Sequence, residues 1–416
     1  MYRRHLSQLR PGQVLARALY TERGDVLLGA GTVLNQFFID KLNARGVISV
    51  FLRDGLGDDV EPNDIVSEEL RASTVTHLAR AFDVISTMAN GTKQNNGKRP
   101  KTVDDLVSRL GERPLELPAP GVSSLQALYQ DVESLMNEIL ESNTIASLES
   151  LKTHNDYTFQ HSVDVAVLGI LLGRTAGLPR DQLRELALGC LLHDLGKMYI
   201  DEAILDKPGR LTAEEFDEIK KHPQMGFELI RRMPVFSILP AHVAFQHHER
   251  QDGKGYPRGL IGDNWLRRSL ADRMDPKRML LIAEIAAVAD VYSALTSDRP
   301  YRPAMPLDKV AQIINEMSGP HLNGEVVRLL THTIPMFPVG HWVEVETGKY
   351  RGWRGVVSEL SADALHQPAI RLLMDDRGHR VPTPVEIDLR INDDVKIKGL
   401  APGEAPFEVV AAVGAS

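Results

Sequence analysis

The sequence predicts a mainly α-helical protein, with a small α/β unit at its start and a small β appendage at its end. Apolar residues recur at helical spacing from about residue 123 to about residue 330. Strand and helix signals alternate over roughly the first 55 residues, and short alternating segments between glycine turns follow Pro335. We therefore expect four parts: an α/β unit at 1–55, a helical linker region with a disordered loop at 56–122, the main helical domain at 123–334 and a small β domain at 335–416.

The first part reads as strands around one helix. GQVLARALY and GDVLL have strand character, and Gly29 and Gly31 mark a turn. A helix is predicted to begin at about Asn35 and to be followed by the strand VISVFL. A further helix is expected at 65–89. The polar segment NGTKQNNGKRPKT then predicts a disordered loop, and a group of three prolines from Pro114 onward predicts a break.

The main domain contains six segments with helical periodicity: SLQALYQDVESLMNEILES, HSVDVAVLGILLGRTAG, RDQLRELALGCLLHDLG, AEEFDEIKKH, SILPAHVAFQHHE and KRMLLIAEIAAVADVYSALTS. The last part contains four short strand-like segments: GHWVEVETG, WRGVVSEL, AIRLLMD and EIDLRI. Helices therefore dominate the middle of the chain, and strands are confined to its two ends.

Composition limits the class of protein. The 416 residues are 43% hydrophobic and 25% charged, which is an ordinary globular mixture. A net charge of −8 argues against affinity for nucleic acid polymers, although a local basic site for a small phosphate ligand stays open. The single cysteine, Cys190, excludes an internal disulfide and reads as a core residue. Without a signal-like start or an uncharged apolar run of about 18 residues, we expect a cytoplasmic protein without a membrane span.

Five histidines and two aspartates in the helical region attract notice, because most of them lie among apolar neighbours on predicted helices. A carboxylate in a helical core is costly unless it is paired or bound to metal, and imidazoles are common metal ligands. Any one histidine alone reads best as an ordinary core or surface imidazole, but the HD pair, the HH pair and an aspartate on an alanine-rich helix are three separate signals. We therefore expect a site for two divalent ions, and N and O ligation fits iron, manganese, zinc, nickel or cobalt. The candidate ligands are His161, His193, Asp194, His222, His247, His248 and Asp290.

Five segments in order resemble the HD-GYP family of bacterial cyclic di-GMP phosphodiesterases, within the HD superfamily of metal hydrolases. They are LKTHNDYTFQHSVDVA, LLHDLGK, ILDKPGRLTAEEFDEIKKHPQMGFELI, HHERQDGKGYPRGL and VADVYSALTSDRPYR, and they span about Thr144 to Leu330. The resemblance implies an all-helical HD-GYP domain that hydrolyses cyclic di-GMP to pGpG in bacterial second-messenger signalling. Further cleavage to GMP stays open.

The resemblance also implies residue roles. One ion would be held by His161, His193, Asp194 and Asp290, and the other by Asp194, His222, His247 and His248, so that Asp194 bridges a binuclear centre of iron or manganese. Asp194 and Lys197 would be catalytic, with Lys197 reaching a phosphate oxygen. Arg299 and Arg302 would contact the other phosphate or the guanine bases. Both histidines of the HH pair can serve one ion if the helix loosens near Glu249.

The GYP stretch, Gly255 to Pro257, lies in a loop for which two interpretations are open. In the family it lies beside the site, which makes Tyr256 a candidate substrate contact, and it has been linked to GGDEF-type cyclase partners. The alternative is a rigid turn that only supports the metal ligands. A homodimer is compatible with the sequence but is not specified by it.

Departures from the family pattern bear on efficiency. Some members carry a glutamate one turn before the first histidine and hold a third metal, whereas this chain has Tyr157 there, so two ions are expected. Ser293 stands where aspartate or asparagine is common, and 261–279 is longer than usual. Two alternatives therefore stay open: a module that binds cyclic di-GMP or a GGDEF-type partner without turnover, and an HD hydrolase of another cyclic dinucleotide.

Overall fold

The computed structural model describes most of the 416 residues, and every structural statement below concerns those residues. They are 2–20, 26–45, 47, 49–53, 65–90, 100–112, 114–142, 157–207, 209–269, 271–272, 275–297, 305–361 and 363–400. The predicted disordered loop falls largely on 91–99, outside the described residues.

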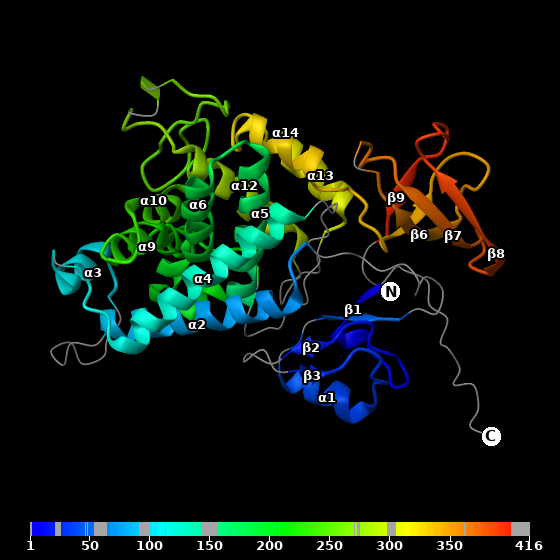
Figure 1. Ribbon diagram of the computed structural model, residues 1–416, viewed down its shortest axis with the longest axis horizontal. Coiled ribbons are helices and arrows are strands. Elements are labelled where there is room, and N and C mark those ends of the chain that lie inside the picture. Colours follow the sequence, from blue (N-terminus) through cyan, green and yellow to red (C-terminus); the bar gives the residue numbers. More distant parts are fainter. Residues whose placement is uncertain are drawn as a thin grey trace.

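A helical domain fills the middle of the chain, which confirms the mainly α class. It consists of α2 (Glu68–Asn90), α3 (Val103–Leu110), α4 (Ala119–Glu141), α5 (Tyr157–Thr175), α6 (Arg180–Leu192), the 3-10 helix η2 (Leu195–Tyr199), α7 (Glu202–Leu205), α8 (Ala213–Ile219), α9 (His222–Ile230), α10 (Ile238–Gln246), α12 (Leu281–Thr296), α13 (Leu307–Met317) and α14 (Gly324–Thr333). Helices α5 and α6 pack against each other, with α12 against α5, α10 against α6, and α2 and α4 beside them (Figure 1).

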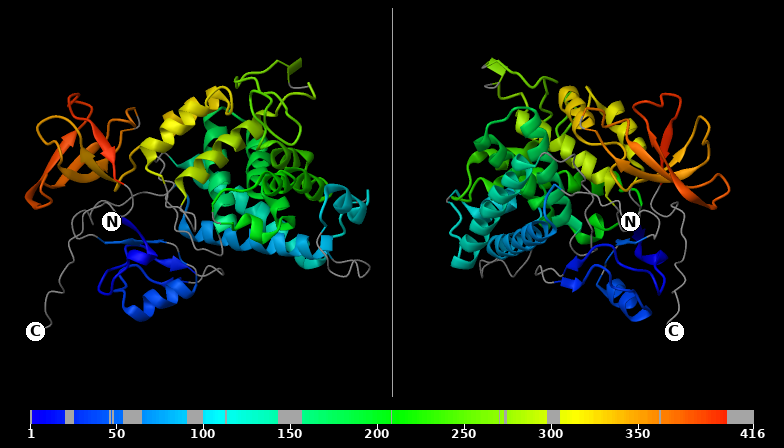
Figure 2. Two further views of the ribbon diagram at one scale, coloured as in Figure 1. Left: turned by 180° about the vertical axis from the view of Figure 1, so that it is seen from behind. Right: turned by 45° about the vertical axis from the view of Figure 1, so that its right-hand side comes forward.

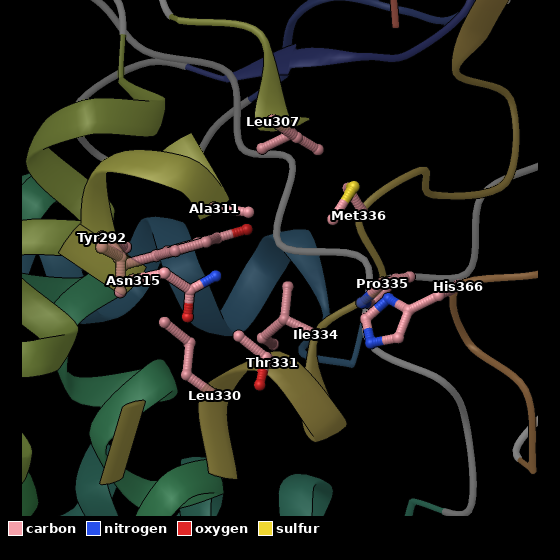
Figure 3. Close-up of a pocket in the computed structure, with 11 residues that line it drawn as sticks. Tyr292, Leu307, Ala311, Asn315, Leu330, Thr331, Ile334, Pro335, Met336 and His366 are labelled. Carbon is pink, nitrogen blue, oxygen red and sulfur yellow. The ribbon is translucent and has the colours of Figure 1, made fainter. Parts of the chain in front are cut away.

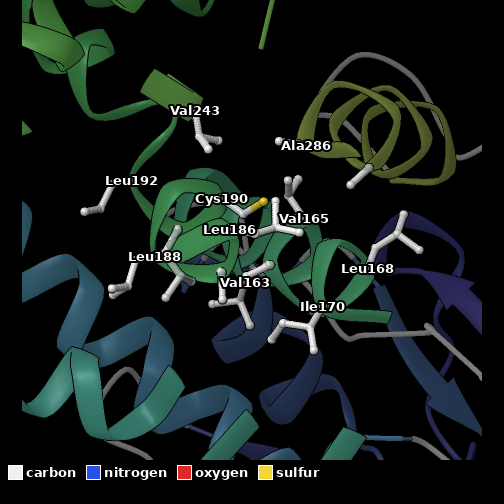
Figure 4. Packing of buried hydrophobic residues seen from close by; sticks show 14 of the residues in the cluster. Val163, Val165, Leu168, Ile170, Leu186, Leu188, Cys190, Leu192, Val243 and Ala286 are labelled. Carbon is white, nitrogen blue, oxygen red and sulfur yellow. The ribbon is translucent and has the colours of Figure 1, made fainter. Parts of the chain in front are cut away.

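The interior of this domain forms because α5 and α6 are apolar on several faces. Val165 of α5, Leu186 of α6, Val243 of α10 and Ala286 of α12 belong to one buried cluster (Figure 4). A methyl group at Gly189 would lie 2.5 Å from the Cβ of Val243, so the glycine allows α6 and α10 to approach closely. This packing fixes the helices that carry the candidate site.

The linker region belongs structurally to the helical domain. Leu78 and Ile85 of α2 lie in the same buried cluster as the residues of α5 and α6. Helix α4 begins at Ala119 and continues across the predicted boundary between 122 and 123. Pro120 contributed to the placement of that boundary. Proline usually interrupts a helix, but Pro120 lies in the first turn of α4. In that turn the backbone N–H groups have no partner within the helix, so the N–H that proline lacks is not needed.

The N-terminal part is an α/β unit, as predicted. It consists of β1 (Tyr2–His5), the 3-10 helix η1 (Leu6–Gln8), β2 (Leu19–Tyr20), β3 (Val26–Leu28), α1 (Gln36–Ala44) and β4 (Ser49–Leu52). Strand β1 pairs antiparallel with β4, and β2 pairs antiparallel with β3. Asn35 begins α1 as predicted, since its side chain accepts a hydrogen bond from the Phe38 N–H at 2.8 Å.

The C-terminal part is a five-stranded antiparallel sheet in the order β8-β7-β6-β5-β9. Its strands are β5 (Trp342–Val345), β6 (Arg354–Glu359), β7 (Ala369–Met374), β8 (Arg380–Asp388) and β9 (Ile397–Gly399). Trp342 and Leu373 share a buried cluster with Leu15 and Leu52 of the N-terminal unit. The N-terminal unit and the C-terminal sheet therefore pack together on one side of the helical domain (Figure 2), which the sequence did not predict.

A pocket of about 200 Å³ lies where α12, α13 and α14 meet the connection to the C-terminal sheet (Figure 3). Ile314, Leu330 and Met336 form apolar walls, and Tyr292 and His366 add polar groups. None of the seven candidate ligands lines it. None of the helices in the described part of the chain is long and apolar enough to cross a membrane.

Candidate metal centre

The seven predicted ligands come together in the helical domain from five places in the chain. Most are deeply buried, while His248 and Asp290 are partly exposed. His161 comes from α5, His193 and Asp194 follow the end of α6, His222 begins α9, His247 and His248 follow α10, and Asp290 comes from α12.

The helix ends explain how adjacent histidines converge. Helix α10 ends at Gln246, three residues before Glu249, so His247 and His248 lie beyond its last residue. The predicted loosening is therefore present, but it begins earlier. Likewise α6 ends at Leu192, and Asp194 precedes the 3-10 helix η2.

A glycine brings the two sides of the cluster together. A Cβ atom at Gly196 would lie 2.0 Å from the backbone oxygen of His222. Only glycine therefore lets η2 contact the start of α9. As a result, Asp194 Oδ1 lies 3.5 Å from His222 Nε2.

Asp194 occupies the middle of the cluster. Its Oδ2 lies 3.4 Å from His193 Nε2, and its Oδ1 lies 3.9 Å from His247 Nε2. On one side, His161 Nε2 lies 3.0 Å from Asp290 Oδ1. On the other side, the Nε2 atoms of His222 and His247 are 3.2 Å apart. A carboxylate in this position can bind an ion on each side.

Three groups of side chains have ligand atoms within 4.8 Å of one another: His161, His193 and Asp194; His222, His247 and His248; and His193, His247 and Asp290. The first two fall inside the two predicted ligand sets. The third crosses them, so the cluster is continuous rather than two separate sites.

Four of the imidazoles are oriented through their Nδ1 atoms. The Nδ1 atoms of His193, His222 and His247 lie 2.6–2.8 Å from the backbone oxygens of Cys190, Ile219 and Ala244. His161 Nδ1 instead lies 2.9 Å from Ser293 Oγ. Because Nδ1 is engaged outward, Nε2 points into the cluster, which is the arrangement of metal-binding histidines.

Two buried atoms in the centre have no hydrogen-bond partner among the described residues. They are His193 Nε2 and Asp194 Oδ1. Leaving such groups unsatisfied is costly, and a divalent cation bound between them would remove that cost. The residues present therefore fit a divalent metal site.

The protonation states of most ligands also fit. Burial lowers the pKa of His247 to about 4 and holds the pKa of His222 and His248 well below the ordinary histidine value. Burial would raise the pKa of Asp194, but His193 and Lys197 lower it well below its usual range. At neutral pH the carboxylate is therefore ionised and these three imidazoles are neutral, the forms that bind metal.

His193 is an exception. Burial lowers its pKa, but the adjacent Asp194 carboxylate offsets this effect and raises the pKa above its ordinary value. A bound cation competes directly with that proton, because Nε2 is the atom that faces Asp194.

The predicted substrate residues are only partly described. Lys197 Nζ lies 2.5 Å from Asp194 Oδ2, and its side chain is 32% exposed. The Tyr256 ring lies 4.8 Å from the His248 ring between centroids, and burial raises the pKa of its phenol. Arg299, Arg302 and the side chain of Tyr157 lie outside the described residues.

Glu249 was not predicted to have a role at the site. This buried carboxylate accepts hydrogen bonds from the backbone N–H groups of Arg258 and Leu260 at 2.7 and 2.9 Å. It therefore fastens the loop that carries Tyr256 to the end of the HH pair. The available signal was a carboxylate directly after two histidines and before a glycine-rich loop.

The segment 261–279 is anchored to the site helices. Arg268 pairs with the buried Glu284 of α12, and Asn323 Nδ2 donates to the same carboxylate at 2.7 Å. Arg268 thus ties this segment to α12 through the same carboxylate that binds the start of α14.

Comparison with known proteins supports the predicted resemblance. Residues 158–295 match the family model described as HD domain. A cyclic di-GMP phosphodiesterase of Pseudomonas aeruginosa is 37% identical over 63% of this chain and 59% of its own. The 3'3'-cGAMP-specific phosphodiesterase 3 of Vibrio cholerae is 34% identical over 44% of this chain and 36% of its own. A cyclic di-GMP phosphodiesterase of Thermotoga maritima is 34% identical over 49% of this chain and 50% of its own. The chain thus spans about half the length of these relatives, and the matches confirm the family resemblance.

Proposed function

We propose that this chain, which carries an HD domain, is a metal-dependent phosphodiesterase that hydrolyses cyclic di-GMP to pGpG. The observation that carries the proposal is the convergence of five imidazoles and two carboxylates around Asp194, with two buried ligand atoms unsatisfied. Two relatives of this chain are named for this activity. Further cleavage to GMP is a question for the same assay.

Two divalent ions, iron or manganese, are the proposed cofactors. His161, His193, Asp194 and Asp290 would hold one, and Asp194, His222, His247 and His248 the other. When bound, such a pair makes water a stronger nucleophile and stabilises the charge that develops on phosphoryl oxygens. No side chain of the cluster then needs to act as a nucleophile.

The residues beside the cluster suit a dinucleotide substrate. Lys197 is exposed enough to exchange its contact with Asp194 for a phosphate oxygen. Tyr256 is held beside His248 as a neutral phenol, so its ring can stack on a guanine base. Arg299 and Arg302 are proposed to contact the second phosphate or the bases. A GGDEF-type partner at the GYP loop and a homodimer stay predictions.

A second candidate function is hydrolysis of 3'3'-cGAMP. The relative named for that substrate is 34% identical to this chain. The two substrates share the cyclic phosphodiester backbone and differ in one base, so the metal ligands do not distinguish them. A binding module without turnover is less well supported, because all seven proposed ligands belong to one cluster.

The test is an assay of metal-reconstituted protein. Protein purified anaerobically and loaded with Fe²⁺ or Mn²⁺ would be incubated separately with cyclic di-GMP and 3'3'-cGAMP, and the products separated by chromatography. We expect pGpG from cyclic di-GMP. Faster cleavage of 3'3'-cGAMP would favour the second candidate, and metal-loaded protein that consumes neither would contradict both.

The substrate contacts have their own test. Lys197→Ala, Arg299→Ala and Arg302→Ala should each weaken cyclic di-GMP binding while the metal content stays unchanged, because a cation near phosphate contributes affinity without binding the ions. Lys220→Ala is the matched control, since Lys220 pairs with the exposed Asp217. Parental binding and turnover in all three variants would show that the pocket is misplaced.

A further inference from the structure

Helix α12 contacts both nitrogens of one imidazole. Asp290 Oδ1 lies 3.0 Å from His161 Nε2, and Ser293 Oγ lies 2.9 Å from His161 Nδ1. Asp290 and Ser293 are three residues apart, so they lie on the same face of the helix. Ser293 is 3% exposed and His161 5%, so water does not compete freely for these contacts.

The Nδ1 partner of His161 differs in kind from the partners of three other histidines. His193, His222 and His247 each face a backbone carbonyl, which can only accept a hydrogen bond. A carbonyl therefore fixes the proton on Nδ1 and leaves the Nε2 lone pair for a metal. A serine hydroxyl can rotate, and it can donate as well as accept. The tautomer of His161 thus depends on the Ser293 hydroxyl at Nδ1 as well as on the Asp290 carboxylate at Nε2.

We propose that Ser293 is a positioning residue for the metal site. Its hydroxyl accepts a hydrogen bond from His161 Nδ1–H, which leaves the Nε2 lone pair facing the ion shared with Asp290. The inference rests on the proposed function only in assuming that the cluster binds two divalent ions. Because Ser293 contacts His161 and no other ligand among the hydrogen bonds described, its effect is confined to the ion on that side.

The expected loss of metal affinity can be judged from other metal sites. Removing the outer partner of a metal-binding histidine typically lowers metal affinity by about 10- to 100-fold. In Ser293→Ala, Nδ1 loses its acceptor and the imidazole can adopt the tautomer that places a proton on Nε2. Ser293→Thr keeps a hydroxyl at the same position and should restore affinity.

The experiment is a Mn²⁺ titration of metal-stripped protein by equilibrium dialysis with elemental analysis. For Ser293→Ala we expect one of the two ions to bind about 10- to 100-fold more weakly and the other to bind as in the parent. Thr296→Val is the matched control, because the Thr296 hydroxyl lies on the same helix and bonds the Tyr292 carbonyl at 2.9 Å. Urea unfolding of the stripped variants separates metal affinity from stability.

Results of two kinds would overturn the proposal. One is a Ser293→Ala variant that holds both ions with parental affinity. The other is equal weakening of both ions, or weakening that Ser293→Thr does not reverse, because these indicate a general packing defect. Failure of the proposed function would look different from failure of the Ser293 proposal. In that case the parent protein would bind two ions and leave cyclic di-GMP intact. The metal affinities of the variants would still test the role of Ser293.

Discussion

The helical domain and the C-terminal sheet both bury imidazole nitrogens, but they surround them differently. His341, just before β5, has a buried Nε2 without a hydrogen-bond partner in the part of the chain that the structure describes, and burial lowers its pKa to about 4. Burial likewise lowers the pKa of His222, His247 and His248, and His193 Nε2 is likewise buried without a hydrogen-bond partner among the described residues. However, no group of potential metal ligands among the described residues includes His341. Burial and a lowered pKa therefore do not indicate a metal site until a second and third ligand converge on the same point.

The largest effect is expected at the residue that joins the two sides of the cluster. Asp194→Asn removes the central negative charge and keeps the side-chain shape, so hydrolysis should fall by at least about 100-fold while the fold is retained. Chromatography of the products and circular dichroism would measure the two effects. Asp217→Asn, at an exposed carboxylate, is the control. Near-normal turnover by a folded, metal-loaded Asp194→Asn protein would refute the mechanism.

The next effect concerns the backbone contact that brings the sides together. Gly196→Ala places a methyl group against the His222 carbonyl and should lower the free energy of unfolding by about 1–3 kcal/mol. It should also weaken metal binding, because η2 must move away from α9. Urea denaturation would measure the first effect. Gly29→Ala is the control, since no atom lies within 4 Å of a Cβ built there. Equal stability of the two variants would contradict this reading.

Single-ligand substitutions sharpen the comparison within the cluster. His161→Ala and His248→Ala each remove a ligand from one side, so each should lower the metal content from two ions per chain towards one. Elemental analysis of anaerobically purified protein would decide this. Full retention of both ions in either variant would remove that residue from the ligand set. Three fully occupied ions in the parent would contradict the stoichiometry expected from Tyr157.

The smallest effect on the site is expected at His341. Its folded pKa of about 4 is below the unfolded value of about 6.5, so the unfolded chain binds more protons between these values. The contribution of His341 to stability is thus complete above pH 6.5 and is lost as the pH falls towards 4. His341→Leu should flatten this dependence by no more than about 3 kcal/mol and leave metal content unchanged. Loss of metal in this variant would break the comparison.

Much of the candidate site could be predicted because each motif that marks it spans only a few neighbouring residues. The HD and HH pairs and the spacing around Asp290 place ligands at helix ends and on helix faces, and the structure brings all seven together. The start of α9 at His222 was missed, because the prediction ran one helix through to that residue, whereas α8 ends at Ile219. The strand β9 was missed because three residues carry too little alternation to be recognised.

The sequence by itself determined the residue types, the faces on which they lie and the succession of helices and strands, because periodicity and capping act over a few neighbouring residues. The tertiary structure decided which nitrogen of these imidazoles faces inward and which histidines lie close to the Asp194 carboxylate. It also decided that the N-terminal unit and the C-terminal sheet share a buried cluster. These features depend on close approach between elements distant in the sequence. The contact of Gly196 with the His222 carbonyl and that of Ser293 with His161 are such approaches, and no local pattern encodes their distances.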